Sequence, residues 1–159
     1  MTEYSFEEIL TLINKNKIES INVCGSPGSG KTTLTKKLAL NLGFEIFDLD
    51  TSFYDVRCNR ISKEQDRIVL SKILDKQYYI IDGTYSSTLK YRSEKIDLFI
   101  FIKSNVWRCL YRFLKRRITS TKIKCGERIT WKTLNLILKF KTIEAKIFDD
   151  LIPNKKLII

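Results

Sequence analysis

The sequence predicts a single α/β domain in which a parallel sheet is flanked by helices. Three observations predict this fold. Short apolar runs alternate with segments of helical periodicity, which is the order of crossover units in a parallel sheet. A glycine-rich segment stands between the first predicted strand and the helix that follows it. The chain has 159 residues, which suffice for one core, so we expect one domain over residues 1–159.

The elements follow from local patterns along the chain. Ser5 and Glu8 have the spacing of a capping box, so a first helix is expected to run from there to about Lys15. A nearly continuous apolar run over 78–81 is typical of a strand that is buried on both faces. Apolar periodicity predicts further strands over 18–23, 44–49, 98–102 and 157–159, and helices over 32–42, 62–76 and 130–149.

One more helix is predicted after the strand at 98–102. On this helix, Arg108, Arg112 and Arg116 form a stripe at four-residue spacing. The helical pattern then breaks over 118–128, which we interpret as a short lid-like loop. A second face of the same helix carries Trp107, Leu110, Tyr111 and Leu114.

The formal net charge is +11, and most of the excess of lysine and arginine falls within residues 104–159. Such an excess favours an anionic partner, namely nucleotide phosphates, a phosphorylated substrate or nucleic acid. The alternative interpretation is a solvated, lysine-rich helical face. The longest apolar run, 98–102, is too short to cross a bilayer, and the N-terminus lacks the pattern of a secretory signal. We therefore expect no membrane span and a cytoplasmic protein.

The chain contains no histidine, and its four cysteines show no Cys-x-x-Cys spacing. This composition excludes zinc enzymes and catalytic triads that depend on histidine. In a cytosolic chain such cysteines are most simply small buried side chains, so we assign no chemistry to them. They are Cys24, Cys58, Cys109 and Cys125.

The chain contains one complete phosphate-binding motif, Gly-x-x-x-x-Gly-Lys-[Ser/Thr], between a predicted strand and a predicted helix. In such a P-loop, backbone N–H groups and the positive end of the helix dipole face phosphate oxygens. Lys31 is expected to reach the β- and γ-phosphates of ATP, and the Thr32 hydroxyl to ligate Mg²⁺. A chance match in a surface turn is the alternative, which the flanking elements disfavour. The candidate nucleotide-binding residues are Gly25, Ser26, Pro27, Gly28, Ser29, Gly30, Lys31, Thr32 and Thr33.

Acidic residues follow two predicted strands, at the sheet edge where ligands of parallel α/β proteins gather. Asp82 ends the strand at 78–81 and is the best candidate for holding Mg²⁺ through a water molecule. Asp48 and Asp50 lie at the end of the strand at 44–49. Asp50 is expected to position or deprotonate a hydroxyl of the acceptor. The alternative for these acids is a role in a turn or as a helix cap.

Arginines flank the predicted lid. Arg112, Arg116 and Arg117 precede it and Arg128 follows it, so their guanidinium groups are candidates for acting on the transferring phosphate. An exposed cationic face is the alternative. Arg92 is a candidate clamp for an anionic acceptor. In all, the candidate catalytic residues are Lys31, Asp50, Arg112, Arg116 and Arg128, and those near the substrate are Asp50, Asp82 and Arg92.

Several of these motifs occur together in a known family. They are the P-loop, Leu49-Asp50, the segment 80–89, Arg92, Cys109-Leu110-Tyr111-Arg112 with Lys115-Arg116-Arg117, and Cys125-Gly126-Glu127-Arg128. Over about residues 20–150 the chain resembles the DNA topology modulation protein family of adenylate-kinase-related P-loop proteins. The resemblance implies a nucleoside-monophosphate-kinase-like fold, binding of ATP and Mg²⁺, and phosphoryl transfer. The family name implies a link to DNA supercoiling, which does not require direct DNA contact.

The chain departs from that family in four respects. It has an additional N-terminal helix, and its shorter lid carries Lys122 and Lys124 where the family is rich in arginine. Lys103 and Ser104 follow the strand at 98–102, where the family has an acid and a nearby proline. The family's final helix is missing after Ile159.

We therefore predict a P-loop kinase that transfers the γ-phosphoryl group of ATP to a small molecule or nucleotide. The acceptor is expected to be anionic or to carry a hydroxyl group. An Asn-Lys-x-Asp motif, which reads guanine, is absent from the sequence, and this disfavours a GTPase. The alternative is a regulatory protein that binds ATP, associates with nucleic acid through residues 104–159, and phosphorylates no small molecule.

Overall fold

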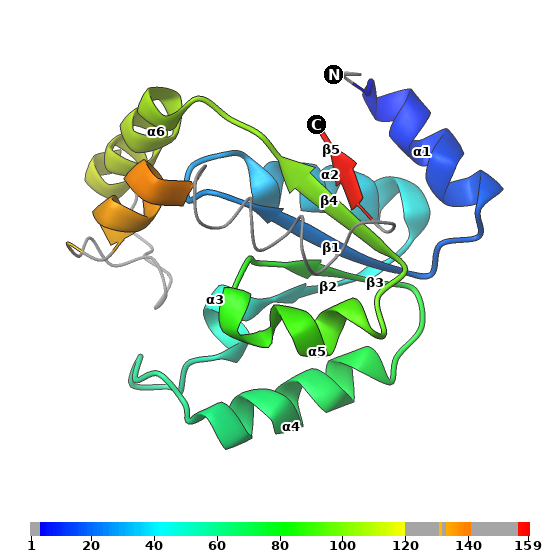
Figure 1. The fold of residues 1–159 in the computed structure, drawn as a ribbon, viewed down its shortest axis with the longest axis horizontal. Coiled ribbons are helices and arrows are strands. Elements are labelled where there is room, and N and C mark those ends of the chain that lie inside the picture. Colours follow the sequence, from blue (N-terminus) through cyan, green and yellow to red (C-terminus); the bar gives the residue numbers. More distant parts are fainter. Residues whose placement is uncertain (1–3, 120–130, 132, 141–155) are drawn as a thin grey trace.

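The computed structural model describes residues 4–119, 131, 133–140 and 156–159. Five parallel strands form one sheet with the order β2-β3-β1-β4-β5 (Figure 1). The strands are β1 (Ser20–Gly25), β2 (Glu45–Asp48), β3 (Tyr79–Asp82), β4 (Leu98–Ile102) and β5 (Lys156–Ile158). The named helices are α1 (Phe6–Lys15), α2 (Lys31–Leu42), α3 (Leu49–Ser52), α4 (Lys63–Leu74), the 3₁₀-helix η1 (Ser86–Thr88), α5 (Leu89–Ser93) and α6 (Val106–Thr119).

Two apolar clusters cover the two faces of the sheet. On one face, α1 and α2 pack against Ile21 and Val23 of β1 and Ile100 of β4. On the other face, α3, α4 and α5 pack against Ile81 of β3 and Phe99 of β4. All six residues of β1 are buried, as expected for the central strand of a parallel sheet that is covered on both sides. The predicted α/β fold is therefore confirmed.

The strand register brings the carboxyl ends of β1, β2 and β3 together. Val23 of β1 lies beside Asp82 of β3, and Asp82 lies beside Asp48 of β2. The loop that follows β1 and the acids that end β2 and β3 therefore share one edge of the sheet. This is the edge at which open parallel sheets bind ligands.

Most predicted elements are confirmed, with boundaries that differ by a few residues. Both predicted capping boxes form: Ser5 with Glu8 at the start of α1, and Ser62 with Gln65 at the start of α4. The strand predicted over 98–102 has the same bounds as β4. The short helices α3 and α5 were not predicted, because four or five residues are too few to show helical periodicity.

The C-terminal predictions are only partly covered by the described residues. Within the helix expected over 130–149, residues 133–140 are helical. Ile118 and Thr119 of the expected lid belong to α6. The remainder of the lid, with Arg128, lies outside the described residues.

Helix α6 does not pack through Trp107 and Tyr111, which lie on the face that the sequence pattern predicted to be apolar. Trp107 is 72% exposed and Tyr111 is 63% exposed. The buried residues of α6 are Cys109 and Phe113, which join Ile137 in a small third cluster. Cys109 faces inward, and its backbone carbonyl lies against the P-loop at Gly28.

The cysteines are of two kinds. Cys24 and Cys109 are free and buried, as predicted. Cys58 corrects the expectation that no cysteine takes part in chemistry, because it forms a disulfide. Cys125 lies outside the described residues. Among the helices of the described part of the chain, none combines the length and the apolar character needed to cross a bilayer.

Candidate functional site

The loop between β1 and α2 has the conformation of a phosphate-binding loop. Gly28 and Gly30 have φ angles of 81° and 103°, in the left-handed region that favours glycine. Gly30 caps the N-terminus of α2, so the free N–H groups of the first helical turn lie at the loop. Lys31 donates a hydrogen bond from Nζ to the carbonyl of Ser26 at 3.0 Å. The P-loop predicted from the motif is therefore present as a structural element.

Thr32 and Asp82 meet at the mouth of this loop. The Thr32 hydroxyl donates a hydrogen bond to Asp82 Oδ2 at 2.6 Å. Asp82 is only 4% exposed, and it lies at the end of β3, directly beside β1. Hydroxyl and carboxylate oxygens are the ligands that Mg²⁺ prefers, either directly or through its bound waters. The pair therefore fits the magnesium site that the sequence predicts.

Thr84 ties the end of β3 to the start of the P-loop. Its hydroxyl donates to the Gly25 carbonyl at 2.9 Å and accepts from the Gly25 N–H at 3.1 Å. One side chain thus satisfies both backbone groups of Gly25. Sequence reasoning gave Thr84 no role, and the available signal was its place two residues after the strand-ending Asp82.

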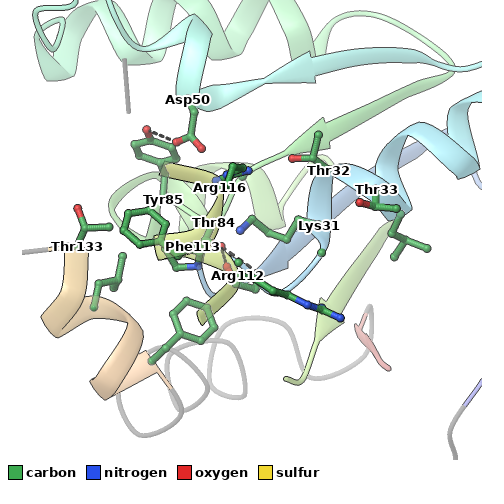
Figure 2. A pocket seen from close by; sticks show the side chains of 18 of the residues that line it. Lys31, Thr32, Thr33, Asp50, Thr84, Tyr85, Arg112, Phe113, Arg116 and Thr133 are labelled. Carbon is green, nitrogen blue, oxygen red and sulfur yellow. Dashed lines mark hydrogen bonds between the residues drawn. The ribbon is translucent and has the colours of Figure 1, made fainter. Parts of the chain in front are cut away.

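Asp50 faces the same space from the first turn of α3. Its Oδ1 accepts a hydrogen bond at 2.8 Å from the hydroxyl of Tyr85 (Figure 2). Asp48, not Asp50, is the N-cap of α3, because the Asp48 carboxylate accepts from the Asp50 N–H at 2.9 Å. The sequence left capping open as an alternative for Asp50. The structure assigns capping to Asp48, and the Asp50 carboxylate is left to line the cavity.

Tyr85 was missed by sequence reasoning. Its ring packs edge-on against Phe53, with ring centres 4.9 Å apart. Burial, together with the neighbouring Asp50 carboxylate, raises the pKa of the Tyr85 phenol well above its ordinary value. The phenol therefore keeps its proton at neutral pH and acts as a hydrogen-bond donor to Asp50.

Arg112 and Arg116 of α6 line the cavity, one helical turn apart. In the view of Figure 2, Arg116 and Lys31 both point into the space beside Asp50, whereas Arg112 extends away from it. Both arginines are exposed. The predicted Arg128 lies outside the described residues, as noted above, and the side chain of Arg117 is likewise not described.

These side chains share one cavity of about 850 Å³. Its walls include the P-loop, Asp50, Thr84, Tyr85 and the two arginines of α6. A volume of this order is within the range of small-molecule sites, which is about 300–1,000 Å³. Of the predicted nucleotide-binding residues, Gly25, Pro27, Gly28, Gly30, Lys31, Thr32 and Thr33 line the cavity, while Ser26 and Ser29 are buried within the loop.

Arg92 corrects a prediction. The sequence suggested that it clamps an anionic acceptor, but its side chain is 0% exposed and it does not line the cavity. The guanidinium group hydrogen-bonds to the Asn22 side chain and to the carbonyls of Gly83, Thr84 and Tyr85. A guanidinium group that is buried and hydrogen-bonded to the protein in this way cannot meet an acceptor directly.

The P-loop packs tightly against α6, which predicts a large cost for one substitution. A Cβ at Gly28 would lie 2.3 Å from the Cys109 carbonyl oxygen, so Gly28→Ala is expected to destabilise the fold by about 2–3 kcal/mol. Gly43 is a matched control: its φ is 72°, but a Cβ there would meet nothing within 4 Å. Gly43→Ala should cost only about 1 kcal/mol. Urea unfolding measures both, and equal losses would contradict a tight contact at Gly28.

Comparisons with known proteins agree with this architecture. A shikimate kinase from Acinetobacter baumannii, solved with shikimate, superimposes with a TM-score of 0.58 at 17% identity, covering 88% of this chain and 83% of that one. The YorR protein of Bacillus subtilis, in complex with phosphorylated GDP, gives a TM-score of 0.57 at 16% identity, with coverages of 88% and 84%. A gluconokinase from Sinorhizobium meliloti gives 0.51 at 14% identity, with coverages of 88% and 81%.

No family model and no curated protein sequence matches the chain. The superpositions on solved structures show that the chain has the α/β P-loop NTPase fold, in the form shared by shikimate and gluconate kinases. At these identities the likeness establishes the fold alone. Membership of the DNA topology modulation family stays a prediction.

Proposed function

We propose that the chain is a kinase that transfers the γ-phosphoryl group of ATP to a hydroxyl group of a small molecule. The observation that carries this proposal is the placement of the Asp50 carboxylate in the same cavity as the P-loop. A P-loop alone is compatible with nucleotide binding or hydrolysis. A carboxylate held by Tyr85 and free of any capping role adds a group suited to an acceptor.

The nucleotide side of the site is served by the P-loop, Lys31 and Thr32. Backbone N–H groups and the Lys31 ammonium would bind the β- and γ-phosphates. Thr32 would ligate Mg²⁺, and Asp82 would hold it through water, as their mutual hydrogen bond suggests. When bound, the ion would neutralise negative charge on the phosphates.

The acceptor side is served by Asp50. In the transfer, a bond forms between the acceptor oxygen and the γ-phosphorus, and the bond from that phosphorus to the bridging oxygen of ADP breaks. The acceptor hydroxyl loses its proton, which Asp50 is placed to accept. The Tyr85 hydroxyl donates to one carboxylate oxygen, so it fixes the direction in which Asp50 faces. A carboxylate oriented in this way can align a hydroxyl for in-line attack.

The test is a phosphotransfer screen on the full chain with Mg-ATP labelled at the γ-position. The acceptor panel consists of polyhydroxy acids, sugars, nucleosides and nucleoside monophosphates. Labelled product with one acceptor class, absent with the Lys31→Ala variant, is the expected result. Mg-ATP binding without transfer to any member of the panel would favour the regulatory alternative.

That alternative joins the family resemblance to the basic segment 104–159. It is tested by the dependence of DNA affinity on salt, which is steep when several phosphates are neutralised. Weak DNA binding with a shallow salt dependence would contradict the regulatory alternative. The cytoplasmic location and the use of ATP rather than another nucleoside triphosphate belong to the same proposal.

Arg116 carries a prediction on the transition state. Because its guanidinium group reaches the cavity from α6, Arg116→Ala should lower kcat by about tenfold or more while changing Mg-ATP affinity by less than about threefold. Arg108 lies on the same stripe and does not line the cavity, so Arg108→Ala is the matched control. Similar kcat values for the two variants would show that the stripe is a solvated surface.

A further inference from the structure

Arg92 occupies an unusual position for an arginine. It lies on α5, is fully buried, and directs its guanidinium group at the segment that follows β3. Three consecutive carbonyls, those of Gly83, Thr84 and Tyr85, accept hydrogen bonds from it. Nη1 also donates to the side-chain oxygen of Asn22, a fully buried residue in the middle of β1. One side chain therefore donates hydrogen bonds to the backbone of all three residues that follow β3.

Burying the charged Arg92 side chain costs folding free energy, so stability alone does not explain its position. The hydrogen bonds from Arg92 to Asn22 and to three backbone carbonyls end on neutral oxygens, and its Nε has no hydrogen-bond partner among the described residues. The side chain of Cys24 also interacts with the guanidinium group and favours its charged form. Burial lowers the pKa of Arg92 to about 10, so the group is still charged at neutral pH. Apolar side chains often fill such a volume at least as well as a buried charge does. The cost therefore points to a role other than packing.

The carbonyls that face Arg92 determine where the side chains of the same segment go. While the backbone of Thr84 and Tyr85 turns its oxygens inward, the Thr84 hydroxyl reaches Gly25 of the P-loop and the Tyr85 hydroxyl reaches Asp50. Tyr85 adopts a φ of 32°, which costs a residue with a Cβ about 1–2 kcal/mol. The hydrogen bond from Arg92 Nη2 to the Tyr85 carbonyl, at 2.9 Å, holds this conformation.

We propose that Arg92 is a positioning residue for phosphoryl transfer, which acts on Asp50 through the backbone and side chain of Tyr85. The effect of Arg92 on phosphoryl transfer rests on the proposed function. Its structural part, that the guanidinium fork holds the 83–85 turn, stands on the hydrogen bonds alone. Arg92 does not itself line the cavity, whereas the residues to which it donates, Gly83, Thr84 and Tyr85, do, so its influence is indirect.

The kinetic test compares Arg92→Lys with Tyr85→Phe and with the double variant. Lysine keeps the charge but lacks the planar fork that spans several carbonyls. We expect Arg92→Lys to lower kcat at least tenfold while the Kd of Mg-ATP changes by less than about threefold. In that background, Tyr85→Phe should add less than a twofold loss, because both changes release the same carboxylate. Lys90→Gln, at an exposed position on the same helix, is the control and should leave kcat unchanged.

A second measurement needs no acceptor. Hydrogen–deuterium exchange of the backbone amides of residues 83–88 should be at least tenfold faster in Arg92→Lys than in the native chain, and unchanged in Lys90→Gln. If the native chain phosphorylates no acceptor, the proposed function fails, while the exchange rates still decide whether Arg92 holds the turn.

Three outcomes would overturn the proposal. The first is unchanged exchange over 83–88 in Arg92→Lys. The second is additive kinetic losses in the double variant, which a merely structural role predicts. If Arg92→Lys does not fold, Arg92→Gln replaces it in both measurements. Failure of both variants to fold is the third outcome, because the guanidinium group would then serve stability alone.

Discussion

Asp50→Asn is expected to lower phosphoryl transfer by about a hundredfold or more, the scale of general acid–base catalysis. Asparagine keeps the size of the side chain and can still accept from Tyr85, so the geometry of the cavity should persist. What is lost is the charge that aligns the acceptor hydroxyl and takes its proton. The affinity for Mg-ATP should change by less than about threefold, because Asp50 lies on α3 and not on the P-loop.

Asp48 provides a matched control two residues away. Its carboxylate caps α3, and asparagine is as good an N-cap as aspartate, so Asp48→Asn should leave both stability and transfer nearly intact. Steady-state kinetics with the acceptor found in the screen, together with calorimetry of Mg-ATP binding, measure both variants. If Asp50→Asn and Asp48→Asn have the same kcat, Asp50 has no role in transfer.

Lys31→Ala is expected to lower turnover by about a thousandfold and to weaken Mg-ATP binding measurably. Removal of one preorganised donor to developing charge commonly costs 10²–10³ in rate, by rough analogy with oxyanion sites. Stability should change by less than about 0.5 kcal/mol, because the partly exposed lysine makes its hydrogen bond to a single carbonyl, that of Ser26.

Lys36, an exposed residue on the same helix, is the control for a change of charge on α2. Lys36→Ala should retain native turnover and native Mg-ATP affinity. Isothermal titration calorimetry, turnover assays and thermal unfolding of the three proteins give the comparison. Unaltered binding and turnover in Lys31→Ala would remove the P-loop from the proposed mechanism.

Local signals carried much of the fold and part of the site. The P-loop could be predicted because its glycines, Lys31 and Thr32 are contiguous and sit between a strand and a helix. The apposition of Asp82 to Thr32 could be predicted because parallel strands end at the same sheet edge. Both inferences depend only on short-range pattern and on the rule that ligands gather at that edge.

The other site residues depend on long-range contacts that no local pattern carries. Tyr85 meets Asp50, which lies 35 positions earlier, and Thr84 meets Gly25, which lies 59 positions earlier. Arg92 looks like a surface residue in the sequence, because arginine is rarely buried. Arg92 is buried because α5 packs against the sheet in the same apolar cluster as β3, and this contact is not visible in the sequence. The sequence also could not show which of Asp48 and Asp50 caps α3, since either carboxylate can serve.

The packed face of α6 was mispredicted for a similar reason. The spacing of Trp107 and Tyr111 resembles an apolar stripe, yet the helix turns Cys109 toward the interior. The backbone carbonyl of Cys109 lies so near Gly28 that even a methyl group would not fit there. The P-loop thus packs against the backbone of α6 at Cys109, and this contact is invisible in the spacing of apolar residues.

The central place of β1 has a consequence for synthesis on the ribosome. β1 pairs with β3 and β4 and with no strand adjacent to it in sequence. Ser20 therefore cannot pair until Tyr79 has been synthesised, and Gly25 cannot pair until Ile102 has been synthesised. Until about two thirds of the chain has emerged, both edges of an apolar strand lack their native neighbours. Folding through such distant pairings is slow, and exposed strand edges invite association between nascent chains. The strand that presents the P-loop is thus the one that most depends on completion of the chain.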